Sequence, residues 1–178
     1  MGWLHHKGFT LVELMVTVAV LAIFAAIAVP SMSSLIQSNR VQGAADEFLS
    51  QLQYARSEAI LRNRVVTVEN TSGTTGEWSK GIRIYASASR TPNTAYSQTT
   101  DGNPLREHSG FNQTGLSIRS SAAQYISFRP NGTLATPAEL QLTACFDNKT
   151  AKAKQVSIQP SGRIKLNAPS TVIASCTP

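Results

Sequence analysis

One apolar stretch near the N-terminus, interrupted by a single acidic residue, constrains this chain more than any other feature. From Leu14 to Val29 the sequence has one polar side chain, that of Thr17. A helix from Phe9 to Val29 would be about 30 Å long at about 1.5 Å per residue, which matches the hydrocarbon thickness of a bilayer. Glu13 lies near its start. An unpaired carboxylate in lipid costs about 2.5–3.5 kcal/mol, so Glu13 is expected to have a function there.

Three interpretations fit the apolar stretch. The first is a cleavable secretory signal with a basic start, an apolar middle and a small-residue site at Ala26-Ile27-Ala28. The second is a plain N-terminal membrane anchor. The third is a signal that is cut before the apolar run, between Gly8 and Phe9, with the run retained. Glu13 favours the third, because the cut leaves an α-ammonium on Phe9 about one helical turn from a carboxylate of the same chain or a packed neighbour.

The residues around this cut form a motif. The segment Gly8-Phe9-Thr10-Leu11-Val12-Glu13-Leu14 resembles the class III signal of type IV pilins and pseudopilins. The resemblance implies that a prepilin peptidase cuts after Gly8, removes residues 1–8 as a leader and methylates the new N-terminal Phe9. It also implies that Glu13 contacts the N-terminus of a neighbouring subunit during assembly. Pro30 falls where many pilins have a helix-kinking proline.

The helix is expected to continue beyond Pro30 with a different character. Residues 9–29 are apolar on all sides, whereas in residues 30–63 apolar or small side chains recur at three- and four-residue steps. This spacing is typical of an amphipathic helix. Its apolar face comprises Val41, Ala45, Phe48, Leu52, Ala55 and Ala59. A kink is expected near Pro30. The first half therefore belongs in lipid or a filament core, and the second half packs on a globular domain.

After residue 63 the periodicity changes from that of a helix to that of strands. Alternating apolar residues and turn residues predict short strands around Val66–Val68 and Ile82–Ile84, and at Leu116–Arg119, Tyr125–Arg129, Leu140–Phe146, Val156–Gln159 and Arg163–Leu166. Residues 86–103 are rich in Ser, Thr, Asn and Gln and predict a long exposed loop. A long helix followed by short strands indicates an α+β fold, in which residues 64–178 form an antiparallel sheet domain on the second half of the helix.

Several internal segments resemble one branch of the pilin family. They are Gln53–Ala59 (QYARSEA), Trp78-x-x-Gly81-Ile82, Phe128–Thr133 (FRPNGT) and the turn Ser161–Ile164. All four are similar to the GspH/FimT/FimU branch of pseudopilins and minor pilins, within which the chain is most similar to the FimU-like proteins. The resemblance implies a GspH-type globular domain over residues 64–178.

The two cysteines, Cys145 and Cys176, indicate a disulfide formed in an oxidising compartment. Two cysteines cannot complete a four-ligand zinc site, and the sequence has no C-x-x-C motif. A bond between them would close a loop of about 30 residues and stabilise the domain by roughly 3–4 kcal/mol on the chain-entropy model. FimU-like minor pilins have a similar C-terminal bridge, so the resemblance implies the same pairing.

The composition gives no support for an active site. The 178 residues include 10 acidic side chains and three histidines, two of which, His5 and His6, lie in the predicted leader. His108 lies in a polar segment and is expected to be solvated. The sequence has no Gly-rich phosphate loop and no G-x-S-x-G motif. We therefore expect no enzyme activity, no metal site and no cofactor.

Basic residues near the C-terminus form the remaining candidate site. They are Lys149, Lys152, Lys154, Arg163 and Lys165, in a chain of net charge +6. Such a cluster is either an exposed, solubilising hairpin or a DNA-binding surface that contacts phosphates. The segment Gly162–Lys165 is similar to the C-terminal Gly-Arg-x-Arg motif of FimT-type pilins that take up DNA. Lys165 replaces the second arginine, however, and lacks its bidentate fork.

Together these features predict a minor pilin of a type IV pilus. Residues 9–29 would anchor it in the inner membrane as a single-pass protein with a periplasmic C-terminal domain. It would then assemble with other minor and major pilins as a structural subunit that acts in pilus assembly and priming. Two alternatives are a pseudopilin of a type II secretion system and a DNA-binding pilin for natural transformation. Genomic neighbours would separate pilus from secretion components.

Overall fold

The computed structural model describes residues 8–111, 114–120, 124–167 and 176. The chain divides into two units between Ser38 and Asn39, so that the long first helix has residues in both. The elements, in chain order, are α1 Leu11–Arg62, β1 Val66–Asn70, β2 Ile82–Ala86, α2 Gln98–Asp101, β3 Arg106–His108, β4 Leu116–Ser120, β5 Tyr125–Phe128, β6 Leu140–Phe146, β7 Lys149–Ile158 and β8 Ile164–Asn167.

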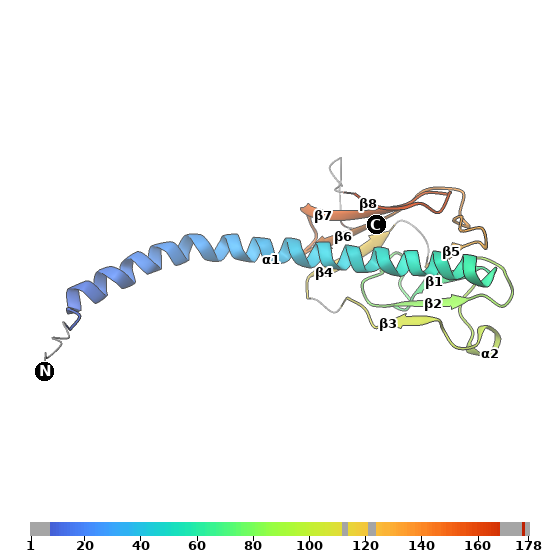
Figure 1. Cartoon of the computed structure of the whole chain (residues 1–178), viewed down its shortest axis with the longest axis horizontal. Helices are drawn as coiled ribbons and strands as arrows, with labels where there is room; N and C mark the ends of the chain where they lie inside the picture. Colours follow the sequence, from blue (N-terminus) through green and yellow to red (C-terminus); the bar gives the residue numbers. More distant parts are fainter. Residues whose placement is uncertain (1–7, 112–113, 121–123, 168–175, 177–178) are drawn as a thin grey trace, which may run out of the picture. The chain divides into compact units, whose positions relative to one another are not determined.

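The first unit consists of the exposed, apolar part of α1. Each described side chain from Gly8 to Ile36 is exposed. α1 contains an 18-residue window of mean hydropathy 2.6, none of it buried, and is long and apolar enough to cross a membrane. The helix continues through Pro30 without a break, and Figure 1 shows this blue part as a curved ribbon. Met32 and Leu35 are still 60% and 56% exposed, so the apolar exposed surface extends past Pro30.

The second unit holds two four-stranded antiparallel sheets, where the sequence predicted one. Sheet A has the strand order β3-β2-β1-β5, and sheet B has the order β4-β6-β7-β8. In the view of Figure 1, β1, β2 and β3 are drawn below the cyan part of α1, and β6, β7 and β8 are drawn above it. The predicted α+β class, a long helix packed on antiparallel strands, is confirmed.

Both sheets pack on one buried stripe of α1. The stripe consists of Val41, Ala44, Ala45, Phe48, Leu52, Ala55 and Ala59, each at most 4% exposed. All six residues that the sequence assigned to this face are buried. Alanines allow the backbone to approach the strands, and Phe48 fills the space between them. Its ring centroid lies 5.9 Å from that of Trp78 and 6.2 Å from that of Phe111. The stripe and both sheets share a single core.

Strand β7 is much longer than predicted. The sequence predicted Val156–Gln159, but the strand begins at Lys149, because a two-residue hairpin carries β6 directly into it. Asp147 and Asn148 have φ values of 49° and 55°, the left-handed conformation that such tight hairpins need. The lysines and alanines in the first half of β7 lack the apolar alternation of a half-buried strand. This segment is therefore a strand because it pairs with β6, and not because of its own sequence pattern.

The predicted loop after β2 is ordered by specific hydrogen bonds. Asp101, at the end of the short helix α2, accepts bonds from the backbone N–H groups of Ala88 and Ser97 at 2.8 and 2.9 Å. Ser127 on β5 donates to Asn93 Oδ1 at 3.0 Å. The loop thus lies against sheet A and helps to bury Glu69 on β1, where desolvation raises the pKa of the carboxyl group.

Two turns from different sheets meet beside α1. Arg56 Nε donates to the carbonyl oxygen of Gly132 at 2.9 Å, in the turn after β5. The backbone N–H of Leu134 donates to Pro160 O at 3.0 Å, in the turn after β7. A Cβ on Gly162 would lie 1.8 Å from Gly132 O, and Gly162 has φ +79°. Glycine is therefore required here both by its backbone conformation and by the close approach of the two turns.

We predict that Gly162→Ala destabilises the globular unit by roughly 3 kcal/mol or more, since it combines a strained φ with a steric overlap. The matched control is Gly73→Ala, because Gly73 has a similar φ of +69° but open space around its Cβ. The control should lose about 1–2 kcal/mol from the backbone strain alone. Urea denaturation of residues 39–178 measures both. Equal losses in the two variants would contradict the close contact.

Candidate functional site

The predicted cleavage site lies immediately outside α1. Gly8, Phe9 and Thr10 are exposed and precede the helix, which begins at Leu11. Thr10 caps the helix, since its side-chain oxygen accepts the N–H of Glu13 at 3.2 Å and its carbonyl accepts the N–H of Leu14 at 3.1 Å. The peptide bond between Gly8 and Phe9 is therefore not tied into helical hydrogen bonds.

Glu13 also lies at a position of α1 that favours an acidic side chain. Thr10 and Glu13 stand at the spacing of a capping box, and a carboxylate in the first turn interacts favourably with the helix dipole. Within the described part of the chain, no cation lies at ion-pair distance from Glu13. The pattern T-x-x-E before an apolar run could have predicted this helix cap from the sequence.

The one polar side chain in the apolar run needs no partner from solvent. The Thr17 hydroxyl donates within the helix, to the carbonyl oxygens of Glu13 and Leu14 at 3.0 and 2.8 Å. The same part of the chain exposes large apolar side chains, including Phe9, Leu14 and Phe24, which are 71%, 58% and 67% exposed. This surface is suited to lipid or to the apolar helices of other subunits, because the Thr17 hydroxyl is satisfied within the helix.

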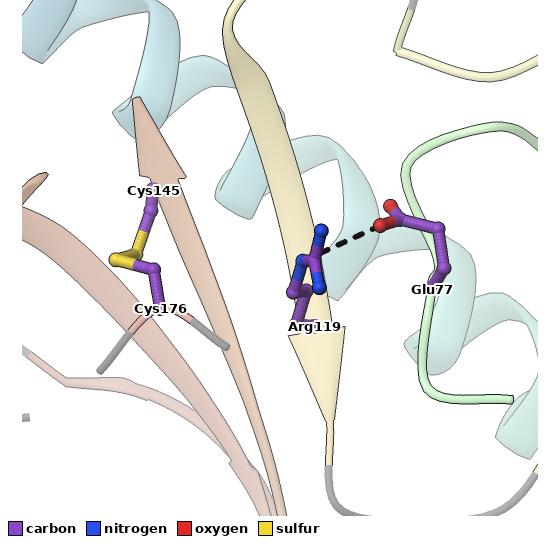
Figure 2. The surroundings of a disulfide bond; sticks show 4 residues. All are labelled: Glu77, Arg119, Cys145 and Cys176. Carbon is purple, nitrogen blue, oxygen red and sulfur yellow. Dashed lines mark ion pairs between the residues drawn. A yellow bond between two sulfur atoms is a disulfide. The ribbon is translucent and has the colours of Figure 1, made fainter. Parts of the chain in front are cut away.

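Cys145 and Cys176 form a disulfide, as the sequence predicted. Cys145 lies on β6 and faces away from α1, because its neighbours Leu142 and Ala144 belong to the main core and Cys145 does not. Both sulfurs are buried and pack with Ala153 of β7. Figure 2 shows Cys176 joined to the strand, with Arg119 of β4 directed toward Glu77 nearby. The bond therefore fixes Cys176 to the outer face of sheet B.

The five basic residues predicted as a DNA site do not form one surface. Lys149 begins β7, whereas Arg163 follows the opposite end of this ten-residue strand, about 30 Å away. Lys154 pairs with Ala144 and so lies on the core side of sheet B. Lys165 pairs with Ser157 on the other face. Lys152 also lies on β7. This separation does not favour a common phosphate-binding surface, and DNA binding stays a prediction.

His108 is held by specific contacts, although it was expected to be solvated. Its Nδ1 accepts the N–H of Gly110 at 3.1 Å, so Nε2 carries the proton and donates to Glu47 of α1 at 2.6 Å. Its ring centroid lies 4.8 Å from that of Phe111. The histidine thus joins β3 to the helix. Among the described residues no group of three or more His, Cys, Asp or Glu side chains could hold a metal ion.

Comparison with known families identifies both parts of the chain. Residues 44–162 match the family described as type II transport protein GspH, and residues 3–29 match the prokaryotic N-terminal methylation motif. The chain belongs to the GspH family. The prediction made from Gly8–Leu14 and the internal segments is confirmed.

Solved structures of GspH-like proteins share this architecture. The type IV minor pilin FimU of Pseudomonas aeruginosa (strain PAO1) matches with a TM-score of 0.64 and 32% identity, over 78% of this chain and 96% of that chain. A second crystal form of FimU gives a TM-score of 0.61 at 32% identity, over 76% and 98%. The minor pseudopilin EpsH of the Vibrio cholerae type 2 secretion system matches with a TM-score of 0.50 over 74% and 99%. Its 15% identity shows the fold alone.

Among curated sequences, two fimbrial proteins of Pseudomonas aeruginosa are 41% identical to this GspH-family chain over 61 residues. The match covers 34% of this chain and 39% of those relatives. It is thus a match to part of each relative.

We predict that Cys176→Ser lowers the free energy of unfolding of the globular unit by roughly 3–4 kcal/mol, because the bond closes a loop with a sequence separation of 31. Urea denaturation measures the change. The double variant Cys145→Ser/Cys176→Ser is the control, and should match the single variant if the cross-link itself is responsible. A reduced wild-type protein as stable as the oxidised one would contradict the prediction.

Proposed function

We propose that this chain is a minor pilin, a structural subunit that is incorporated into a type IV pilus and acts in pilus assembly. The observation that carries the proposal is the similarity to the minor pilin FimU, at 32% identity over 78% of this chain. The alternative is a pseudopilin of a type II secretion system, for which EpsH offers a likeness of fold at 15% identity. The protein acts by binding other subunits and not as an enzyme.

Processing by a prepilin peptidase is supported by the position of the scissile bond. The bond between Gly8 and Phe9 is exposed and precedes the Thr10 cap, so a peptidase can bind it without unwinding α1. A Cβ on Gly8 would meet nothing within 4 Å, and the fold of this chain does not require glycine there. We therefore assign the need for Gly8 to the peptidase. Cleavage removes residues 1–8 and leaves Phe9 as the N-terminal, methylated residue.

Assembly uses the exposed part of α1. Residues 9–29 hold the processed subunit in the inner membrane, with residues 64–178 in the periplasm, where the Cys145–Cys176 bond can form. The amphipathic residues 30–63 join these two parts. In the filament the apolar helices pack together, and the Glu13 carboxylate pairs with the ammonium group of Phe9 in a neighbouring pilin. Pairing removes most of the cost of a charge in apolar surroundings.

We predict that Gly8→Leu blocks processing and leaves a full-length precursor with an unmethylated Phe9, because the larger side chain excludes the bond from the peptidase site. Intact mass spectrometry of the membrane fraction measures both changes. Gly43→Leu is the matched control, since a Cβ at Gly43 also meets nothing within 4 Å. Normal cleavage of Gly8→Leu would contradict the assignment.

We predict that Glu13→Ala and Glu13→Gln leave membrane insertion intact but reduce the amount of processed protein in sheared filaments at least about tenfold, since a lost pairing of this kind is worth more than about 1.4 kcal/mol. Glutamine can still complete a capping box, so Glu13→Gln separates the charge from the helix cap. Glu13→Asp keeps the charge and should retain much of the incorporation. Normal incorporation of Glu13→Gln would assign Glu13 to the cap.

A further inference from the structure

Arginines gather at the end of the globular unit where α1 terminates. Strand pairing places the segments of this end side by side. Val66 pairs with both Ala86 and Phe128, and the N–H of Ser87 donates to Val65 O. The turn after β7 joins it through the contact between Leu134 and Pro160. The arginines in these segments are Arg56, Arg62, Arg64, Arg90, Arg129 and Arg163. We call this surface the arginine-rimmed end.

Three of these guanidinium groups are held in place by backbone carbonyl groups. Arg56 donates to Gly132 O at 2.9 Å, Arg64 to Ala88 O at 3.4 Å and Arg129 to Ala135 O at 3.3 Å. Each bond uses one nitrogen and leaves other N–H donors available. A guanidinium that is already fixed loses less conformational entropy when it binds a carboxylate.

Few carboxylates neutralise this end. Arg62 pairs with Glu58 at 2.5 Å, whereas none of the other five arginines has a carboxylate within 4 Å in the described ranges. The Asp101 carboxylate is occupied by two backbone N–H groups. Glu139 precedes β6 on this side of sheet B and is exposed. The surface therefore keeps an excess of positive charge.

The same end exposes two adjacent apolar side chains. Ile60 and Leu61 are 51% and 78% exposed, and they are the large exposed hydrophobic residues of the described part of residues 39–178. Both belong to the last turn of α1, next to Arg62. Exposed apolar side chains on the same surface as several arginines have the composition of a protein–protein interface, in which arginine is enriched.

We propose that the arginine-rimmed end docks on an acidic and partly apolar surface of a different subunit of the same filament. This proposal rests on the proposed function. A second copy of this chain is a poor partner, because the chain carries 16 basic and 10 acidic residues and two arginine-rimmed ends would repel. Nucleic acid would pair with the arginines but leave Ile60 and Leu61 without apolar contacts.

The test is site-specific photo-cross-linking in intact filaments. Benzoylphenylalanine replaces Leu61 in the full chain, expressed in a piliated host from which the wild-type copy is deleted, and mass spectrometry identifies the cross-linked peptide. The expected product joins Leu61 to a peptide of another pilin that contains or adjoins Asp or Glu. The same probe at Lys149, an exposed position at the opposite end of β7, is the matched control and should not give that product.

Charge reversal tests the role of the arginines. In the Leu61 probe background, Arg129→Glu combined with Arg163→Glu should reduce the yield about fivefold or more, whereas Arg129→Lys with Arg163→Lys should retain most of it. The inference is overturned if the probe yields no cross-linked product, or if it reacts with a second copy of this chain, lipid or nucleic acid. It is also overturned if charge reversal leaves the yield of the cross-linked product unchanged. If the processed chain is absent from sheared filaments, the proposed function itself fails; if it is present without this product, only the docking inference fails.

Discussion

The C-terminal half of α1 supplies the apolar surface on which both sheets of the globular unit pack. Its stripe has alanine at four of seven positions, so the helix backbone can lie close to the strands, and Phe48 fills the space between Trp78 and Phe111. Each sheet buries one face against this stripe. The other faces are covered differently: the loop after β2 lies against sheet A, and Cys176 is fastened to sheet B.

One helix thus serves two environments. Up to Ile36 its side chains are exposed and mostly apolar, and from Val41 to Ala59 its buried apolar residues form one face. Packing on the sheets removes the second set from water. The first set has no such cover within the described residues of this chain. This uncovered apolar surface is the one that the proposed membrane anchor and the proposed filament core would bury.

Much of this structure could be predicted from the sequence, because the periodicity of a helix or a strand depends only on residues that are close together in the chain. The helix stripe follows from steps of three and four residues, and β6 was predicted with its exact bounds from its own alternation and flanking turns. Long-range pairing explains most of what was missed. The first half of β7 is a strand because β6 lies beside it, and β3 pairs with β2 across a long loop. Lys149 and Arg163 are close in sequence, but they lie at opposite ends of a ten-residue strand.

The contact between Gly132 and Gly162 has a mechanical consequence. A subunit held by its N-terminal helix transmits any pull along the axis of α1, which loads the contacts between helix and sheets in shear. Most of these contacts are apolar and resist sliding weakly, because they have no preferred direction. The Arg56 hydrogen bond and the two interlocked turns are directional, and they lie near the last turns of the helix. In the proposed filament they would resist sliding of α1 along the sheets under tension.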